Sequence, residues 1–256
     1  MRSGRIDLGG RFLRTELGNP YANLALEEAI HAAGEGPSLR AWEDQTAVVV
    51  GRAQLAQEET DTKYCRDHSI PIVRRFTGGG TVYHGPGNLN WSFFARKATR
   101  HPRISYERDP AAVFRSFAAV VLEALESLVS GCRFDPPNRI VSREGKVSGM
   151  AAYVSESSVL CHGTLLLSAD LRLADMLTKP TAKSLEARYP RSSYARIANL
   201  GLKRADVEKS LVEASKADPT PADLTKAESR LASRLEAEKY RQDGWNLGDP
   251  FSSDYA

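Results

Sequence analysis

The chain has 256 residues, of which 41% are hydrophobic and 26% charged, and its formal net charge is +3. The length suits one large domain or two small ones. No run of about 18 apolar residues exists to cross a membrane, and the N-terminal segment MRSGRIDLGGRF lacks the apolar core of a signal peptide. Three scattered cysteines are too few for a disulfide framework or a zinc site. We therefore expect a cytoplasmic protein, with no membrane partner.

Strands and helices alternate in the first hundred residues. Asn19 can cap a helix that has Pro20 at its first position, and Gly34 is a natural stop. Thr46 opens a β-branched run that predicts a buried strand ending at Gly51. Strands are predicted over 11–17, 46–50, 70–75, 81–84 and 89–95, and helices over 19–34 and 57–66.

The second half begins with the clearest helix, which we expect to start at Asp109-Pro110 and to end at Gly131. Apolar residues recur there at helical spacing and mark one buried face. Strands and helices follow without a regular βαβ rhythm, which favours a mixed α+β domain over a doubly wound sheet. Strands are predicted over 140–141, 147–153 and 159–168, as one meander, and helices over 171–177, 204–215 and 222–241.

The most informative segment is RRFTGGGTVYHGPGNLN, from Arg74 to Asn90. Three consecutive glycines leave the backbone bare for a ligand to approach. Arg74 and Arg75 add forked donors that suit phosphate or carboxylate. The segment therefore predicts a backbone cradle for an anion, although a flexible turn beside two solvated arginines would show the same pattern. It lacks the GK[ST] of a Walker loop.

Other residues with chemical potential are a lysine, two histidines and a cysteine. Lys146, in REGKVSGMAAY, is either a surface charge or a cation that stabilises a developing negative charge. His84 and His162 have no carboxylate at a spacing that makes a catalytic triad evident. Cys132 is either a buried hydrophobe or a nucleophile that carries an acyl thioester. Basic and acidic residues are interspersed, so a nucleic-acid partner is not expected.

Together these segments resemble the lipoate–protein ligase family. RRFTGGGTVYHGPGNLN is similar to its RRxxGGGxVxHxxGNxx signature, EGKVSG to its lysine motif, and CHGTLLLSADL to its HHGTLL strand. NPYANLALEEAI, WEDQTAVVVGRAQ, SSYARIANL and GWNLGDPF match further segments in the family's order. The matches cover roughly residues 10–250, and their joint specificity is much higher than that of any single motif.

The resemblance implies a class II synthetase-like biotinyl/lipoyl transferase domain, in which a mixed β-sheet is flanked by helices. It also implies two reactions: (R)-lipoate and Mg²⁺-ATP give lipoyl-adenylate, and a lysine of an acceptor protein then displaces AMP. Lys146 would be the catalytic residue, bridging the lipoyl carbonyl and the phosphate. Metal ligands are not identified. The implied ATP- and lipoyl-AMP-binding residues are Arg75, Thr77, Gly78, Gly79, Gly80, Thr81, Val82, Tyr83, His84, Asn88, Asn90, Lys146, Ser148, Gly149, His162, Gly163 and Thr164.

The resemblance implies lipoyl carrier domains as partners, of the E2 or glycine-cleavage H protein type. We expect residues 1–256 to form a single catalytic domain without the family's C-terminal accessory domain, whose place a separate subunit could take. Leu24, Val50 and Val73 are candidates for the apolar slot of the dithiolane. Asn138-Arg139 stands where the family usually has Asn-Asp, and Cys161 replaces the first histidine of HHGT.

Three alternatives remain open. A related acyltransferase would move octanoyl from acyl carrier protein through a thioester on Cys132, without ATP. A biotin–protein ligase shares the fold, but its GRGRxGR pattern is absent from this sequence. A binding module, or the carrier-recognition half of a split ligase, would bind the adenylate or the acceptor with no turnover.

Overall fold

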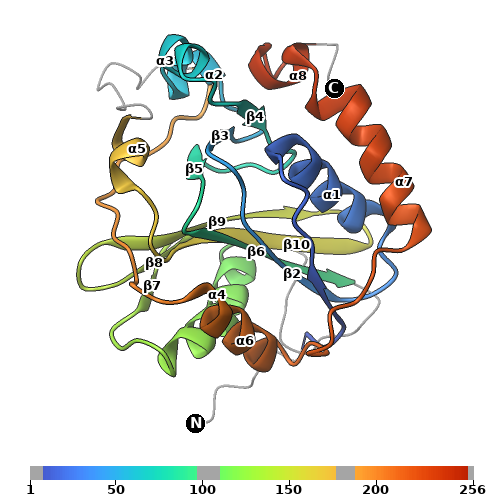
Figure 1. Cartoon of the computed structure of the whole chain (residues 1–256), viewed down its shortest axis with the longest axis vertical. Coiled ribbons are helices and arrows are strands. Elements are labelled where there is room, and N and C mark those ends of the chain that lie inside the picture. Colours follow the sequence, from blue (N-terminus) through green and yellow to red (C-terminus); the bar gives the residue numbers. More distant parts are fainter. Residues whose placement is uncertain (1–7, 97–109, 177–187, 253–256) are drawn as a thin grey trace.

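A computed structural model describes residues 8–96, 110–176 and 188–252. One large β-sheet forms the centre of this structure. Seven strands lie in the order β1-β2-β6-β10-β9-β8-β7 (Figure 1). β1 and β2 are parallel, and the other neighbouring pairs are antiparallel, so the predicted meander of β8, β9 and β10 is confirmed. The strands are β1 (Arg11–Arg14), β2 (Ser38–Trp42), β6 (Asn88–Arg96), β7 (Arg133–Asp135), β8 (Arg139–Val141), β9 (Lys146–Val154) and β10 (Ser158–Leu166).

The main hydrophobic core lies on one face of this sheet. Helices α4 (Pro110–Glu126) and α6 (Arg204–Ser215) cover that face, which is the lower one in Figure 1. Because side chains alternate along a strand, β6 directs Leu89, Trp91 and Phe93 toward these helices, where all three are fully buried. Apolar side chains therefore fill the space between this face of the sheet and the two helices.

The other face of the sheet carries a second layer that is more polar. Helix α1 (Pro20–Ala33), helix α7 (Lys226–Leu235), its π-helical continuation η2 (Glu236–Tyr240) and a small sheet lie above it in Figure 1. Alternation along β6 directs Asn88, Asn90 and Ser92 to this side, and all three are buried. Buried amide and hydroxyl side chains need hydrogen-bond partners. This polar face is therefore the candidate location of a ligand site.

The small sheet positions the glycine segment. It contains β4 (Ile72–Arg74), β3 (Ala47–Val50) and β5 (Val82–His84) in that order, and the glycines connect β4 to β5. Pairing is parallel between β3 and β4 and antiparallel between β3 and β5. Four short helices complete the described part of the fold: α2 (Ala56–Glu59), α3 (Thr62–Asp67), α5 (Leu171–Met176) and α8 (Asp243–Leu247).

The α+β prediction is confirmed, and so is the start of α1, where the Asn19 side chain accepts a hydrogen bond from the backbone of Ala22. Helix α4 ends at Glu126 and not at Gly131, and the predicted cap Asp109 lies outside the described residues. None of the helices in the described part of the chain is long and apolar enough to span a membrane.

Two predicted helices besides α4 were wrong in extent, and three elements were missed. The helix expected over 57–66 is broken into α2 and α3, because Asp61 caps a new helix by accepting from the backbone of Tyr64. The helix expected over 222–241 begins only at Lys226, after a capping box formed by Thr225 and Glu228. The sequence did not indicate β2, β7 or α8.

Candidate active site

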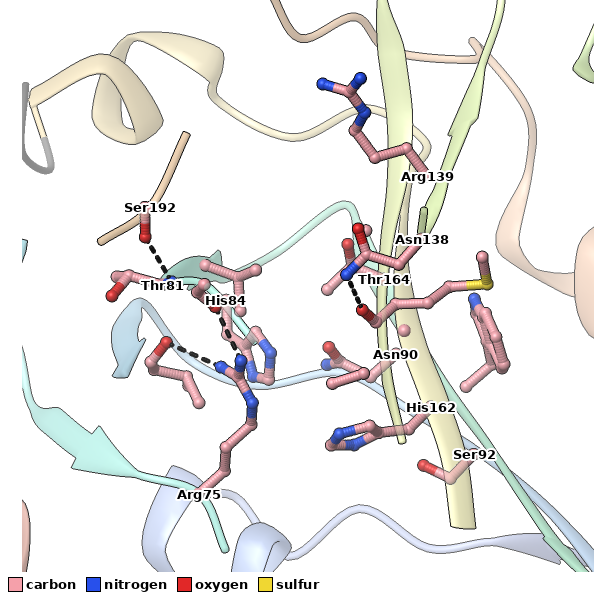
Figure 2. Close-up of a pocket in the computed structure, with 18 of the residues that line it drawn as sticks. Arg75, Thr81, His84, Asn90, Ser92, Asn138, Arg139, His162, Thr164 and Ser192 are labelled. Carbon is pink, nitrogen blue, oxygen red and sulfur yellow. Dashed lines mark hydrogen bonds between the residues drawn. The ribbon is translucent and has the colours of Figure 1, made fainter. Parts of the chain in front are cut away.

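A cavity of about 160 Å³ lies between the polar face of the large sheet, helix α1 and the small sheet. Figure 2 shows its two walls, with Arg75, Thr81 and His84 on one side and strands β6, β9 and β10 on the other. The cavity therefore forms where the second layer covers the sheet incompletely. Among the predicted site residues, those that line it are Arg75, Gly80, Thr81, Val82, His84, Asn90, Lys146, Gly149, His162, Gly163 and Thr164.

The glycine segment forms a tight loop at the edge of this cavity. Gly79 has φ of +87°, a left-handed conformation that favours glycine. Its carbonyl oxygen lies so close to Gly51 that a Cβ on Gly51 would approach it to 2.1 Å. Gly78 and Gly79 are exposed at the tip of the loop, and only Gly80 lines the cavity. The loop backbone is thus accessible from the cavity near the C-terminal end of the loop and not along its whole length.

Arg75 holds this loop together from inside. Its guanidinium donates to the carbonyl oxygens of Gly78 at 2.6 Å, Gly80 at 2.7 Å and Val49 at 3.2 Å, and its Nε to the hydroxyl of Thr77 at 3.1 Å. Burial lowers the pKa of Arg75 to about 10, so the group stays charged at neutral pH. Most of its donors are used by protein carbonyls, which gives Arg75 a structural task beside any contact with a ligand.

Arg74 points away from the site, contrary to the sequence-based interpretation of an arginine pair. Adjacent residues of a strand face opposite sides, and Arg74 is fully buried against the C-terminal segment. It donates to the carbonyl oxygens of Trp245 at 2.6 Å and Gly248 at 3.0 Å, while the Trp245 indole donates to the Arg74 carbonyl at 2.8 Å. Arg74 therefore anchors α8 to the small sheet.

A short segment that we call the strap (residues 188–193) closes the cavity beside the loop. The backbone N–H of Thr81, predicted to hold a phosphate, donates to Ser192 Oγ at 2.7 Å (Figure 2). Ser192 donates in turn to Glu59, and Arg191 lies 3.1 Å from the same carboxylate. A ligand that uses the Thr81 N–H must therefore displace the Ser192 hydroxyl. The sequence did not reveal this arrangement.

Lys146 enters the cavity at the start of β9. Burial lowers the pKa of its ammonium, and the charges of Arg139 and Arg75 lower it further. Within the described part of the chain, no hydrogen bond or ion pair involves its Nζ. By contrast, Arg139 pairs with Asp135 at 2.7 Å, although both arginine and lysine line the same cavity. Lys146 is thus a desolvated cation that is available to an anionic ligand.

Both cavity histidines pair with buried carboxylates, although no carboxylate lies at a sequence spacing that makes a triad evident. His162 Nδ1 lies 2.8 Å from Glu27 Oε2, and its Nε2 lies 2.8 Å from the Thr77 hydroxyl. His84 Nδ1 lies 3.0 Å from Asp44 Oδ2. Burial raises the pKa of Glu27, but its neighbours, His162 first among them, outweigh burial and leave that pKa below its usual range.

Asn90 is the clearest sign of an absent polar partner. Its side chain is buried and lines the cavity, yet neither Oδ1 nor Nδ2 has a hydrogen-bond partner in the described structure. Such a buried amide costs about 1–3 kcal/mol unless water or a ligand satisfies it. The neighbouring Asn88 differs, because its Nδ2 donates to the carbonyl oxygen of Tyr83 and braces the turn before β6.

The apolar part of the cavity is formed by α1, β2 and the small sheet. Leu24, Trp42, Val49 and Val82 line it, so Leu24 lies where an apolar slot is available. The prediction was wrong for Val50 and Val73. Val50 packs in a separate cluster with Cys65, and Val73 is fully buried behind the wall, in the same cluster as Leu24 and Val49. Since β3 alternates, Val49 and not Val50 faces the cavity.

The remaining predicted residues do not line the cavity. Cys132 does not line the cavity; it packs half-buried against the main core on the α4 side, where burial raises the pKa of its thiol. That environment does not favour a thiolate nucleophile. The other predicted residues that do not line the cavity are Thr77, Gly78, Gly79, Tyr83, Asn88 and Ser148.

Comparison with known families identifies the domain type. The model of the lipoyl protein ligase A/B catalytic domain matches residues 19–214. The lipoate-protein ligase A subunit 1 of Thermoplasma acidophilum is 30% identical over 261 aligned positions, which cover 93% of this chain and 97% of that protein. A lipoate-protein ligase of Bacillus subtilis is 31% identical, but its alignment covers 72% of this chain and only 54% of that protein.

Solved structures give the same result. A bi-partite lipoate protein ligase from T. acidophilum, described with its E2 lipoyl domain, superimposes with a TM-score of 0.80 at 29% identity, over 94% of this chain and 96% of that chain. A lipoate-protein ligase A bound with ATP superimposes with a TM-score of 0.78 at 27% identity, over 94% and 99% of the two chains.

Proposed function

This chain belongs to the lipoyl protein ligase A/B catalytic-domain family, and we propose that it activates lipoate with ATP and transfers the lipoyl group to a lysine of a carrier domain. The single observation that carries the proposal is the unpaired Lys146 ammonium in a cavity that has an apolar end and a bare-backbone edge. An amphiphilic acid fits such a cavity, with its hydrocarbon chain against Leu24 and Val49 and its carboxylate toward Lys146.

Activation joins two anions, a carboxylate and a phosphate, and thus needs fixed positive charge. Lys146 can neutralise both partners as the mixed anhydride forms, because a desolvated ammonium interacts more strongly with a ligand than a hydrated one. Arg75 keeps the glycine loop in place, and the backbone of Gly80 and Thr81 can approach the phosphate once the Ser192 hydroxyl is displaced. Apolar walls exclude water, which would otherwise hydrolyse the anhydride.

ATP supplies the adenylyl group and a pyrophosphate leaving group when it binds. Within the described residues, no group of three or more His, Cys, Asp or Glu side chains gathers as metal ligands. Mg²⁺ therefore enters the proposal only as the ion that usually accompanies ATP phosphates, and we assign no step to it. We also propose that the described residues form a single catalytic domain and that this domain acts in the cytoplasm.

A second subunit is a separate proposal that a specific comparison favours. The chain spans 97% of a protein named subunit 1, and the matching structure is described as bi-partite. The ATP-independent transferase has less support, because Cys132 packs against the core and does not line the cavity. An E2-type acceptor is supported by the matching T. acidophilum structure, which is described with its E2 lipoyl domain, and an H-protein acceptor by the family resemblance.

Mass spectrometry of a purified lipoyl carrier domain tests these proposals. We expect a lipoyl mass increase with this chain, ATP, Mg²⁺ and lipoate, and a parallel reaction with octanoate will show the acyl preference. Addition of cell extract will reveal a required second subunit. Modification from octanoyl-acyl carrier protein without ATP would instead establish the transferase, and the absence of any product under all conditions would refute ligation.

A further inference from the structure

The two histidines of the cavity make the same kind of contact through Nδ1 but differ in the surroundings of Nε2. Each ring uses Nδ1 to contact a buried carboxylate, Asp44 for His84 and Glu27 for His162. A carboxylate can only accept a hydrogen bond, so Nδ1 carries a proton in both rings. The neutral form of each ring then presents the lone pair of Nε2, and the partner of that atom decides what the ring can do.

His162 has its Nε2 occupied. Thr77 Oγ1 lies 2.8 Å from this nitrogen and accepts from Arg75 Nε at 3.1 Å, so the threonine hydroxyl is free to donate to His162. The carboxylate of Glu27, the other partner of the ring, also accepts from Ser92. Both ring nitrogens of His162 thus lie against protein groups, and neither is left open toward the cavity.

His84 has no such outer partner. Its ring lines the cavity, and no hydrogen bond involves Nε2 within the described part of the chain. In Figure 2 the ring points into the cavity, toward the strand face that carries Asn90 and His162. The Trp42 ring meets it edge-on at 5.4 Å between centroids and limits its rotation. The open nitrogen of a fixed imidazole therefore faces the space where the ligand would lie.

Asp44 is itself held in place by hydrogen bonds. Its Oδ1 accepts from Asn23 Nδ2 at 2.7 Å, and Asn23 Oδ1 accepts from Arg40 at 2.5 Å. Arg40 is fully buried and also donates to the backbone carbonyl of Asn23 at 2.9 Å. This chain of bonds fixes the carboxylate, which in turn fixes the tautomer of His84, as in carboxylate–histidine pairs that orient a base.

We propose that His84 is the general base of amide formation, the second step of the proposed function on which this inference rests, and that Asp44 is its positioning residue. The acceptor lysine arrives as a neutral amine after it releases one proton to water. Its nitrogen bonds to the acyl carbon, and His84 Nε2 takes the proton that this nitrogen must then lose. The bond between the acyl carbon and the phosphate oxygen breaks, AMP departs with the electron pair, and His84 passes its proton to water.

The chemistry separates this role from adenylation. Lipoate attacks ATP as a carboxylate and has no proton to lose, so the first step requires no base. A positioned base contributes about 10²–10⁴-fold to a step that does require one. Asp44 is the one anion in hydrogen-bond contact with the His84 ring among the described residues. The other charged or titratable groups that face the cavity or lie behind its walls are Glu27, Arg40, Arg75, Arg139, Lys146, His162 and Arg191.

Single-turnover transfer from synthetic lipoyl-adenylate to a purified lipoyl carrier domain tests the inference without depending on adenylation. We expect His84→Gln to lower the transfer rate by about 10²-fold or more and to remove its rise with pH across the range in which histidine titrates. Asp44→Asn should lower the rate less than His84→Gln does and should alter the pH dependence of transfer, because the ring loses the carboxylate that fixes its tautomer. His68→Gln, which changes an exposed histidine outside the cavity, should match the unmodified chain.

Two further measurements distinguish a base from a binding or structural role. Hydroxylamine at high concentration captures acyl-adenylates without an enzymic base, so His84→Gln should retain hydroxamate formation from the bound adenylate. If that variant fails to fold, His84→Ala with added imidazole replaces it, and we expect imidazole to restore transfer about 10-fold, a part of what a positioned base supplies. Transfer by His84→Gln at the unmodified rate over the whole pH range, or equal losses of transfer and hydroxamate capture with an unaltered pH profile, would overturn the inference. No transfer by the unmodified chain would overturn the proposed function and this step with it.

Discussion

Alanine at Gly149 should displace the Lys146 ammonium without altering either the lysine itself or the fold. Gly149 lies on β9, and a Cβ there would approach Lys146 Nζ to 2.8 Å and Cε to 3.0 Å. Ordinary contact begins at 3.4 Å, so Nζ must retreat by about 0.6 Å or more, and a misplacement near this size costs up to about 10²-fold in rate. That factor corresponds to about 2.7 kcal/mol of transition-state stabilisation.

The same substitution should leave thermal stability almost unchanged. Gly149 does not have a positive φ, and the atoms that its Cβ would meet belong to the flexible end of a lysine. Pyrophosphate release with lipoate and ATP, and transfer from synthetic lipoyl-adenylate, report the two half-reactions. Gly36→Ala is the matched control, because its Cβ would meet nothing within 4 Å. Unmodified rates in both assays for a folded Gly149→Ala protein would show that the position of Lys146 is not used.

Three more outcomes follow from the same geometry. Lys146→Met should lower adenylate formation by about 10²–10³-fold and raise the melting temperature at neutral pH. Between the lowered pKa of Lys146 and its unfolded value of 10.5, the unfolded chain binds more protons, so the stability gain should be full below this window and vanish above it. Gly79→Val should cost about 1–2 kcal/mol of stability, because a left-handed residue acquires a Cβ 3.0 Å from Arg75 and 3.3 Å from Ala151; adenylate titration should also show weaker binding. Cys132→Ala should retain ATP-dependent transfer, and an acyl group trapped on Cys132 by mass spectrometry would contradict this.

The parts of the site that a short segment contains were predictable from the sequence. The glycine loop, His84, Asn90 and Lys146 all lie in motifs whose residue types point to their chemistry, and all line or border the cavity. Strand alternation implies that adjacent arginines face opposite sides, but only the topology shows that Arg75, and not Arg74, faces the loop.

Partners that are distant in the sequence were not predictable. Asp44 precedes His84 by 40 residues, Ser192 follows Thr81 by 111, and no local pattern links either pair. Strand β2 was missed for a related reason. Its sequence SLRAW is buried throughout and includes Arg40, so neither an alternating pattern nor a continuous apolar run marks it.

The charge balance of the cavity explains why Lys146 alone can select a ligand that carries negative charge. Glu27 and Asp44 are buried and hydrogen-bonded, and Arg40 contributes a compensating positive charge to both. Arg139 and Arg191 line the cavity but pair with carboxylates at 2.7 and 2.6 Å. Lys146 alone among the described cavity cations lacks a protein acceptor, and its lowered pKa shows that the protein environment penalises that charge. A mixed anhydride that carries one negative phosphate would remove the penalty, whereas a neutral product amide would not, so the same group that retains the intermediate favours release of the modified carrier.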